Sequence, residues 1–220
     1  MKLESVGILI AMRAFDEKNA IAQIFSREYG IMSGMMRGAV VARTNRPLVG
    51  QIGNMSWNAR LDSALGIFHW ESEKNLAVPI MARGDLLTFM NAAFDLIATM
   101  LPERESYVAL YDETVELLCA LPGANAPADE YLKWEINLLR ELGYALDLSH
   151  CSGCGRTDNL HYLSPKTGRA VCENCAAPYI NKLYRLPVTL NTTLRFIESI
   201  CATVGTDVPQ FRTMLNKIKI

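Results

Sequence analysis

The chain has 220 residues, of which 50% are hydrophobic and 20% are charged. This composition is ordinary for a globular protein, and the length allows one large domain or two small ones with a real core. No apolar run reaches the roughly 18 residues of a membrane helix, and the acid near the start makes a poor signal peptide. We therefore expect a cytoplasmic protein with no membrane segment. The formal net charge of −1 gives no overall sign of a nucleic-acid partner.

Positive charge is unevenly distributed along the sequence. Residues 1–80 hold 9 Lys and Arg against 7 acids, whereas the rest of the chain holds 13 against 16. Between Glu28 and Asp62 there is no acid at all. The arginines within that acid-free stretch are Arg37, Arg43, Arg46 and Arg60.

The first 80 residues consist of short apolar or alternating runs separated by turn-like stretches, a pattern typical of strands. The expected strands are Val6–Arg13, Ala20–Ser26, Ile31–Arg37, Val49–Asn58 and Ala64–Glu71. Five strands in so short a stretch suggest a small antiparallel barrel, for which an OB-like and an SH3-like arrangement are both candidates. Gly38–Pro47 is expected to be a loop that carries arginines.

After Pro79 the period of the apolar residues becomes helical. Helices are expected around Leu86–Ile97, Val108–Leu118 and Leu132–Leu142, with Asp129 as the N-cap of the third, then from about Thr189 to Val204 and from near Pro209. Their apolar stripes predict the core of a helical bundle. The sequence thus predicts an α+β protein with domains at residues 1–79 and 80–220.

Four cysteines form two Cys-x-x-Cys pairs separated by 17 residues, namely Cys151, Cys154, Cys172 and Cys175. Two residues between cysteines let a tight turn aim both sulfurs at one point, and two such turns complete a tetrahedral four-sulfur site. Between the pairs, Leu160–Leu163 and Arg169–Val171 are expected to form a hairpin. The pattern predicts a zinc ribbon at about residues 149–178 that holds one structural zinc ion.

Other roles for these cysteines agree less with the sequence. A thioredoxin-like redox pair needs one Cys-x-x-Cys in a βαβ setting, which is absent here. A catalytic zinc ion needs an open coordination position, which four thiolates do not leave. Six cysteines in a reducing compartment also argue for metal or free thiols rather than disulfides.

No motif in the sequence points to catalysis. There is no Gly-rich phosphate loop and no G-x-S-x-G, and His69, His150 and His161 show no triad-like spacing. We therefore predict that the protein is not an enzyme. A hydrolase or transferase with a zinc-ribbon accessory is the alternative, and it lacks a candidate nucleophile and base.

The acid-free arginine stretch has two interpretations. Its arginines can simply face solvent. On a small barrel, however, an arginine loop beside the aromatic residues Trp57, Phe68 and Trp70 is also suited to single-strand binding, because arginines neutralise phosphates and rings stack on bases. The residue types alone leave both interpretations open.

Several further segments follow one another along the chain, namely Gly7–Ile10, Phe25–Gly30, Arg37–Ala39, Tyr131–Leu148 followed by the first cysteine pair, Leu163–Val171 and Leu186-Pro187. In this order they resemble RecO, a family of bacterial recombination mediators. The resemblance covers essentially the full chain, and the order and spacing of the segments make it specific.

The resemblance implies an N-terminal OB fold and a C-terminal helical domain with a zinc element. It implies binding of single- and double-stranded DNA, annealing of complementary strands, and a location at the nucleoid. It also implies partnership with RecR and, in some systems, RecF. Such proteins help RecA load onto DNA coated by single-strand-binding protein, and many bind the acidic C-terminal tail of that coating protein.

With this resemblance, the arginines become candidate DNA ligands. We expect phosphate contacts from Arg37, Arg43, Arg46 and Arg60, with Arg13 and Arg27 as additions. Many relatives carry a denser basic run after the Arg-Gly-Ala element, whereas this chain has Val40, Val41 and Ala42 there. The alternative is therefore a scaffold that binds RecR and the coating protein, with only marginal direct DNA contact.

Overall fold

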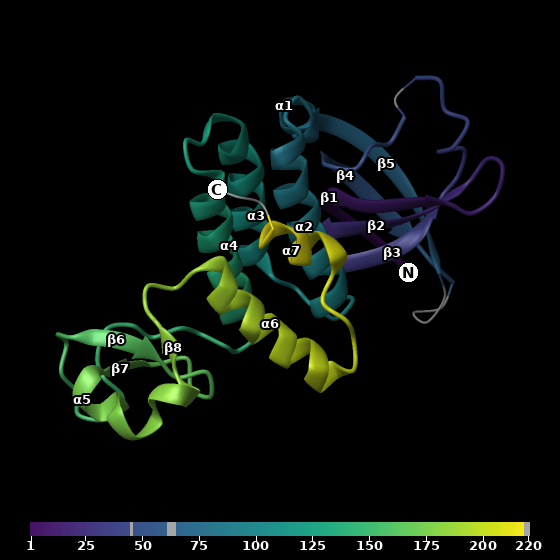
Figure 1. Ribbon diagram of the computed structural model, residues 1–220. Helices are drawn as coiled ribbons and strands as arrows, with labels where there is room; N and C mark the ends of the chain where they lie inside the picture. Colours follow the sequence, from purple (N-terminus) through teal and green to yellow (C-terminus); the bar gives the residue numbers. More distant parts are fainter. Residues whose placement is uncertain (45, 61–64, 218–220) are drawn as a thin grey trace. The chain divides into compact units, whose positions relative to one another are not determined.

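The computed structural model describes residues 1–44, 46–60 and 65–217. The chain divides into two compact units, Met1–Pro127 and Ala128–Ile220 (Figure 1). The expected boundary at residues 79 and 80 falls inside the first helix, α1 (Ala77–Met81), a few residues after the last barrel strand and within the first unit. Within the described residues, none of the helices combines the length and apolar character that crossing a lipid bilayer requires.

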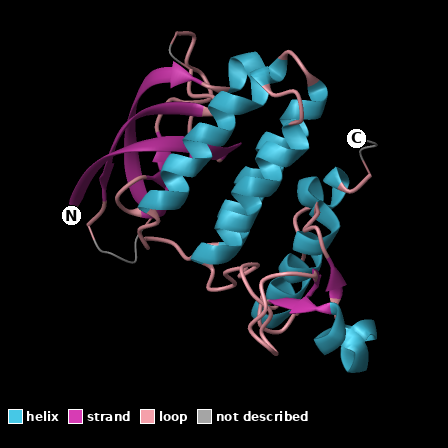
Figure 2. Cartoon of the chain, turned by 90° about the vertical axis from the view of Figure 1, so that its left-hand side faces the viewer, coloured by secondary structure: helices cyan, strands magenta, loops and turns pink. Residues whose placement is uncertain are grey.

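Five strands form a closed barrel in the first unit, in the order β1-β2-β3-β5-β4 (Figures 1 and 2). They are β1 (Lys2–Ala14), β2 (Ala20–Ser26), β3 (Gly30–Met36), β4 (Gln51–Asn58) and β5 (Gly66–Asn75). All neighbours are antiparallel except β3 and β5, which pair in parallel through three residues each. This OB-like barrel confirms the predicted fold class. The expected start of the fifth strand, Ala64, lies outside the described residues.

The barrel forms because its strands alternate between an apolar inner face and a more polar outer face. In β4, for example, Met55 and Trp57 are buried whereas Asn54 and Asn58 are exposed. Trp57 is fully buried, and its indole N–H donates to the carbonyl of Ser33 at 3.0 Å. A Cβ on Gly66 would lie 2.0 Å from the Trp57 ring, so glycine is needed for this close approach.

Three helices complete the first unit: α1 (Ala77–Met81), α2 (Gly84–Met100) and α3 (Val108–Ala120), the last followed by the 3-10 turn η1 (Leu121–Gly123). The ring of Tyr111 on α3 packs against that of Phe25 on β2, with centroids 5.6 Å apart. Between α2 and α3, Glu103 forms a parallel bridge with Ile31. These contacts explain why the helices that follow the barrel belong to its compact unit.

The second unit contains helices and a three-stranded antiparallel sheet in the order β7-β6-β8 (Figure 1). Its elements are α4 (Pro127–Glu141), β6 (Leu160–Leu163), β7 (Ala170–Cys172), α5 (Glu173–Ala176), η2 (Ala177–Lys182), β8 (Tyr184–Arg185), α6 (Leu190–Val204) and α7 (Gln210–Leu215). The predicted N-cap at Asp129 is wrong, because α4 begins at Pro127 and Asp129 lies in its first turn. Thr189 is the N-cap of α6 and forms a capping box with Thr192.

A buried ion pair joins three helices of the second unit. Arg212 on α7 and Glu135 on α4 are both 0% exposed. The Arg212 guanidinium donates to both carboxylate oxygens of Glu135, and Nη2 also donates to the carbonyl of Leu190 at 2.6 Å. Its Nη1 donates to Asn216 at 2.9 Å. A pair of opposite charges so fully desolvated is stable only with this degree of hydrogen bonding.

Candidate metal centre and nucleic-acid surface

The four cysteines of the predicted zinc ribbon converge on one point. All four Sγ atoms lie within 4.8 Å of one another, and those of Cys154 and Cys172 are 3.7 Å apart. None forms a disulfide. Zinc–sulfur bonds of about 2.3 Å in a tetrahedron place sulfurs roughly 3.8 Å apart. The donor set therefore fits a single four-coordinate metal ion.

The chain around the first cysteine pair turns its backbone N–H groups toward sulfur. Gly155 adopts a φ of 77°, which closes the turn after Cys154. The N–H groups of Gly153 and Cys172 donate to Cys151 Sγ at 3.4 and 3.3 Å. Donors of this kind stabilise a thiolate, which is the form that binds a metal.

The second pair spans the junction of β7 and α5. Cys172 is the last residue of β7 and is fully buried, whereas Cys175 lies on α5. Pairing of Leu160 with Cys172 in the hairpin of β6 and β7 fixes this end of the cluster. The expected hairpin is thus confirmed, and it positions one of the four sulfurs.

Two thiols of the cluster, those of Cys151 and Cys175, have pKa values shifted in opposite directions. Backbone hydrogen bonds, chiefly from Cys172, lower the pKa of Cys151 to about 6. Hydrogen bonds from neighbouring thiols, first that of Cys154, raise the pKa of Cys175 to about 12. One thiolate in the cluster disfavours a second beside it, whereas a divalent cation would favour all four. The electrostatics therefore agree with a metal centre.

All six predicted phosphate ligands are exposed, but the structure does not bring them to one place. Arg37 and Arg60, distant in sequence, line the same hollow of about 620 Å³ together with Lys2. Arg13 lines another hollow, on the outer face of β1, β2 and β3. Arg43 and Arg46 lie on the connection between β3 and β4.

Among the residues that the structure describes, Arg27 differs from the other five because its charge is paired with a carboxylate. Its Nε and Nη2 each donate to Asp112 at 2.8 Å. This bidentate contact raises the pKa of Arg27 and lowers the pKa of Asp112. A phosphate would have to displace this carboxylate, so Arg27 is the weakest of the six candidates.

Two of the three aromatic residues considered for base stacking are buried and not available for that role. Trp57 and Phe68 are 0% and 5% exposed, and both belong to the barrel core. Trp70 is half-buried and packs against the same core. The alternation of the strands turns Trp57 and Phe68 inward, so these two rings cannot accompany the arginines in stacking on bases.

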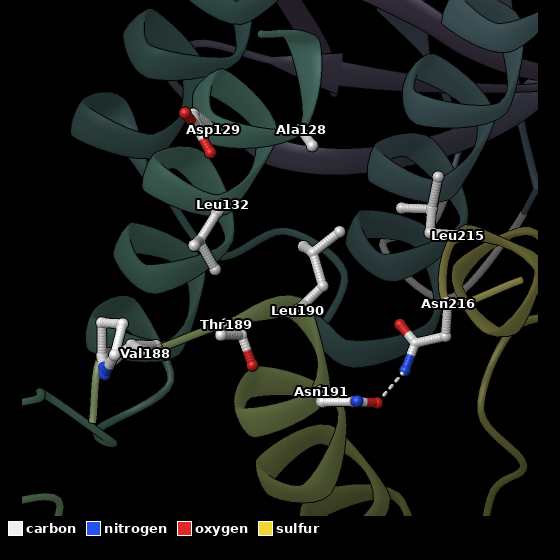
Figure 3. A pocket seen from close by; sticks show the side chains of 10 residues that line it. Ala128, Asp129, Leu132, Val188, Thr189, Leu190, Asn191, Leu215 and Asn216 are labelled. Carbon is white, nitrogen blue, oxygen red and sulfur yellow. Dashed lines mark hydrogen bonds between the residues drawn. The ribbon is translucent and has the colours of Figure 1, made fainter. Parts of the chain in front are cut away.

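An apolar groove in the second unit was not predicted from the sequence (Figure 3). It has a volume of about 610 Å³ and is lined mainly by α4, the start of α6 and the end of α7. Asn216 donates to Asn191 at 2.7 Å at its margin. Of the described residues that line it, Asp129 is the only charged one. The lining is scattered over distant segments, so no local motif signals it.

Comparison with known proteins identifies both parts of the chain. Residues 1–69 match the model of the recombination protein O N-terminal domain, and residues 81–206 match that of its C-terminal domain. The chain is 36% identical over 182 residues to the DNA repair protein RecO of Ruegeria sp. (strain TM1040), covering 82% of this chain and 76% of the relative. It is 36% identical over 199 residues to the DNA repair protein RecO of Jannaschia sp. (strain CCS1), covering 89% and 80%.

These matches first define the class of protein, which acts in DNA repair and recombination. Within that class, the chain belongs to the RecO family. The resemblance seen in the sequence is thereby confirmed.

Proposed function

We propose that the protein is a non-enzymatic recombination mediator that binds DNA, anneals complementary strands and helps RecA load onto DNA coated by single-strand-binding protein. The observation that carries this proposal is the hollow on the barrel where Arg37 and Arg60 converge. Within the described residues, neither arginine forms an ion pair with a carboxylate, whereas Lys2 of the same hollow is paired with Glu4. Arginines without a carboxylate partner on an OB-type barrel are suited to a nucleic-acid backbone.

Arg43, Arg46 and Arg13 extend this basic surface in the proposal. Arg43 and Arg46 extend from the loop after β3, and Arg13 contributes from the barrel's outer face. Each phosphate contact adds about 0.7 to the slope of log affinity against log salt for single strands. The double variant Arg37→Gln/Arg60→Gln is therefore expected to reduce that slope by about 1.4. An unchanged slope would remove both residues from the DNA surface.

We propose that the four-cysteine cluster holds one structural zinc ion. When bound, the ion supplies charge neutralisation and cross-linking, and four thiolates leave no position for a reacting water. Cys151 and Cys154 would tie the loop after α4 to Cys172 and Cys175 at the end of the hairpin. Metal analysis of the purified protein tests this role, and the expected result is one zinc ion per chain.

A second candidate function is a scaffold that binds RecR and the single-strand-binding protein with marginal DNA contact. The apolar groove of the second unit favours it, because an apolar hollow suits a segment of a protein partner. Its lining does not favour an acidic tail, because its charged residue is the acid Asp129. DNA binding measured with and without RecR separates the two: a scaffold would bind DNA only when RecR is present.

A further inference from the structure

Arg195 on α6 is held in place without losing its charge. Its guanidinium carbon lies 5.1 Å from the ring centroid of Tyr184, a cation–π contact. Tyr184 is itself fixed by Phe196, whose ring meets it edge-on with centroids 5.6 Å apart. The side chain of Arg195 is therefore preorganised, while its N–H groups stay available to a ligand.

A second arginine faces the same hollow. Arg185 follows Tyr184 on β8, and both residues pair with β6. The hollow, about 280 Å³, is lined by Leu183, Tyr184, Arg185, Asn191, Thr192 and Arg195. Among the described residues, its lining thus contains two guanidinium groups, three uncharged side chains with polar atoms and no carboxylate. Of the uncharged ones, Asn191 is hydrogen-bonded to Asn216 and Thr192 to Thr189.

Neither arginine is neutralised within the part of the chain that the structure describes. No ion pair joins Arg185 or Arg195 to an acid, and Glu198, one turn along α6 from Arg195, forms none with it. Asn191 and Thr192 belong to the first turn of α6, a helix of 15 residues. The positive end of that helix adds to the field of the two arginines.

We infer that this hollow is a second phosphate-binding site, through which the C-terminal unit contacts the backbone of single-stranded DNA. The inference rests on the proposed DNA-binding function. Two guanidinium forks around a small polar hollow match phosphate oxygens better than an apolar ligand. Base stacking is not its role, because Tyr184 already carries Arg195 on its ring face and Phe196 against it.

The site depends on the same small sheet as the cysteine cluster. β6 pairs with β8, which carries Arg185, on one side and with β7, which ends at Cys172, on the other. A metal ion that fixes β7 therefore also fixes the strand that presents Arg185. Through this sheet, a metal ion at the cysteine cluster can stabilise the phosphate site.

The test is a salt titration of a fluorescently labelled 30-residue oligo(dT) with the full chain. The variant Arg185→Gln/Arg195→Gln is expected to reduce the slope of log affinity against log salt by about 1.4, at about 0.7 per contact. The variant Arg185→Lys/Arg195→Lys keeps both charges and is expected to restore the slope. The matched control Arg83→Gln/Lys133→Gln also removes two charges, but these are already paired with Asp85 and Glu130.

The outcomes separate this inference from the proposed function. If the wild-type chain does not bind the oligonucleotide, the proposed function fails and the inference fails with it. If wild type binds and Arg37→Gln/Arg60→Gln reduces the slope, but Arg185→Gln/Arg195→Gln does not, only this inference is overturned. The inference is also overturned if Arg185→Gln/Arg195→Gln loses affinity for a labelled poly-Glu peptide while its slope of log DNA affinity against log salt is unchanged.

Discussion

The barrel and the cysteine-bearing sheet are both small β structures, but they are held together differently. The barrel closes on itself and buries a core cluster of ten residues, including Trp57 and Met55. The sheet of β6, β7 and β8 has strands of two to four residues and a cluster of five buried residues, two of which are cysteines. Apolar burial is enough for the first, whereas the second has too little of it.

Because of this difference, the two regions should be destabilised by different changes. The stability of the barrel should fall when substitutions change the shape or volume of side chains in its core or at its tight turns. The stability of the cysteine-bearing sheet should fall when the proposed metal ion is lost, because too few apolar side chains are buried there to hold the sheet together without it. The helices of the second unit depend in addition on one buried ion pair. The following experiments use these differences, beginning with the largest expected effect.

Removing one of the four proposed zinc ligands should unfold the cysteine element and leave the barrel folded. Structural zinc sites contribute about 10–16 kcal/mol in zinc-finger peptides, far more than the small apolar cluster here can supply. For Cys172→Ser we expect loss of bound zinc and rapid proteolytic cleavage within residues 149–188. Mass spectrometry of the fragments checks this, with Cys201→Ser, a buried cysteine outside the cluster, as control. Equal protection of the element in both variants would contradict the account.

Removing one partner of the buried ion pair should destabilise the second unit. Arg212→Met leaves the Glu135 carboxylate buried without its main partner, and such changes cost about 3–5 kcal/mol. Urea unfolding followed by the circular dichroism of the helices measures the loss. The double variant Glu135→Leu/Arg212→Met removes both charges and is expected to recover a large part of the stability. A single variant as stable as wild type would refute the role assigned to this pair.

Two glycines of similar backbone conformation should respond differently to alanine. Gly30 has a φ of 64° and Gly38 a φ of 70°, so each substitution carries the left-handed backbone cost of about 1–2 kcal/mol. A Cβ at Gly30 would lie 1.8 Å from the carbonyl oxygen of Glu105, whereas at Gly38 it would meet nothing within 4 Å. Gly30→Ala should therefore lower the unfolding midpoint in urea clearly more than Gly38→Ala. Equal effects would show that the segment after α2 does not pack tightly against β3.

The smallest expected effect comes from the exposed pair of Arg27 and Asp112. Arg27 lowers the pKa of Asp112 below its ordinary value of 3.8 in the folded protein. The pair therefore adds stability above that value and loses it as the pH falls through the folded pKa. Asp112→Asn should be slightly less stable than wild type at pH 7, and the difference should close at the acid end of a pH series. A difference that grew toward low pH would have the wrong sign.

The sequence predicted the regular parts of the molecule well, because their residues carry a period. Ala20–Ser26 was predicted to the residue, and Thr189 marks the start of α6 as expected. The cysteine cluster was also predictable, since its two turns are local motifs. Short elements such as α5 and β8 were missed because two to four residues are too few to show a period.

Features that depend on distant partners could not be predicted from local pattern. Arg212 lies in the short helix α7, and nothing near it in the sequence indicates that Glu135, far earlier in the chain, will pair with its charge. Likewise, nothing in the sequence near Arg27 indicates that Asp112, distant in the chain, will pair with it. Arg185 and Arg195 belong to no basic run in the sequence, so the local charge pattern does not single them out.

The most direct test of the central claim is strand annealing. Complementary oligonucleotides, each coated with the organism's own single-strand-binding protein, would be mixed with and without the protein, and duplex formation followed by fluorescence quenching. The account predicts that the protein accelerates annealing and that Arg37→Gln/Arg60→Gln weakens this effect, while Arg83→Gln/Lys133→Gln does not. An annealing rate that the zinc-loaded protein leaves unchanged would contradict the account.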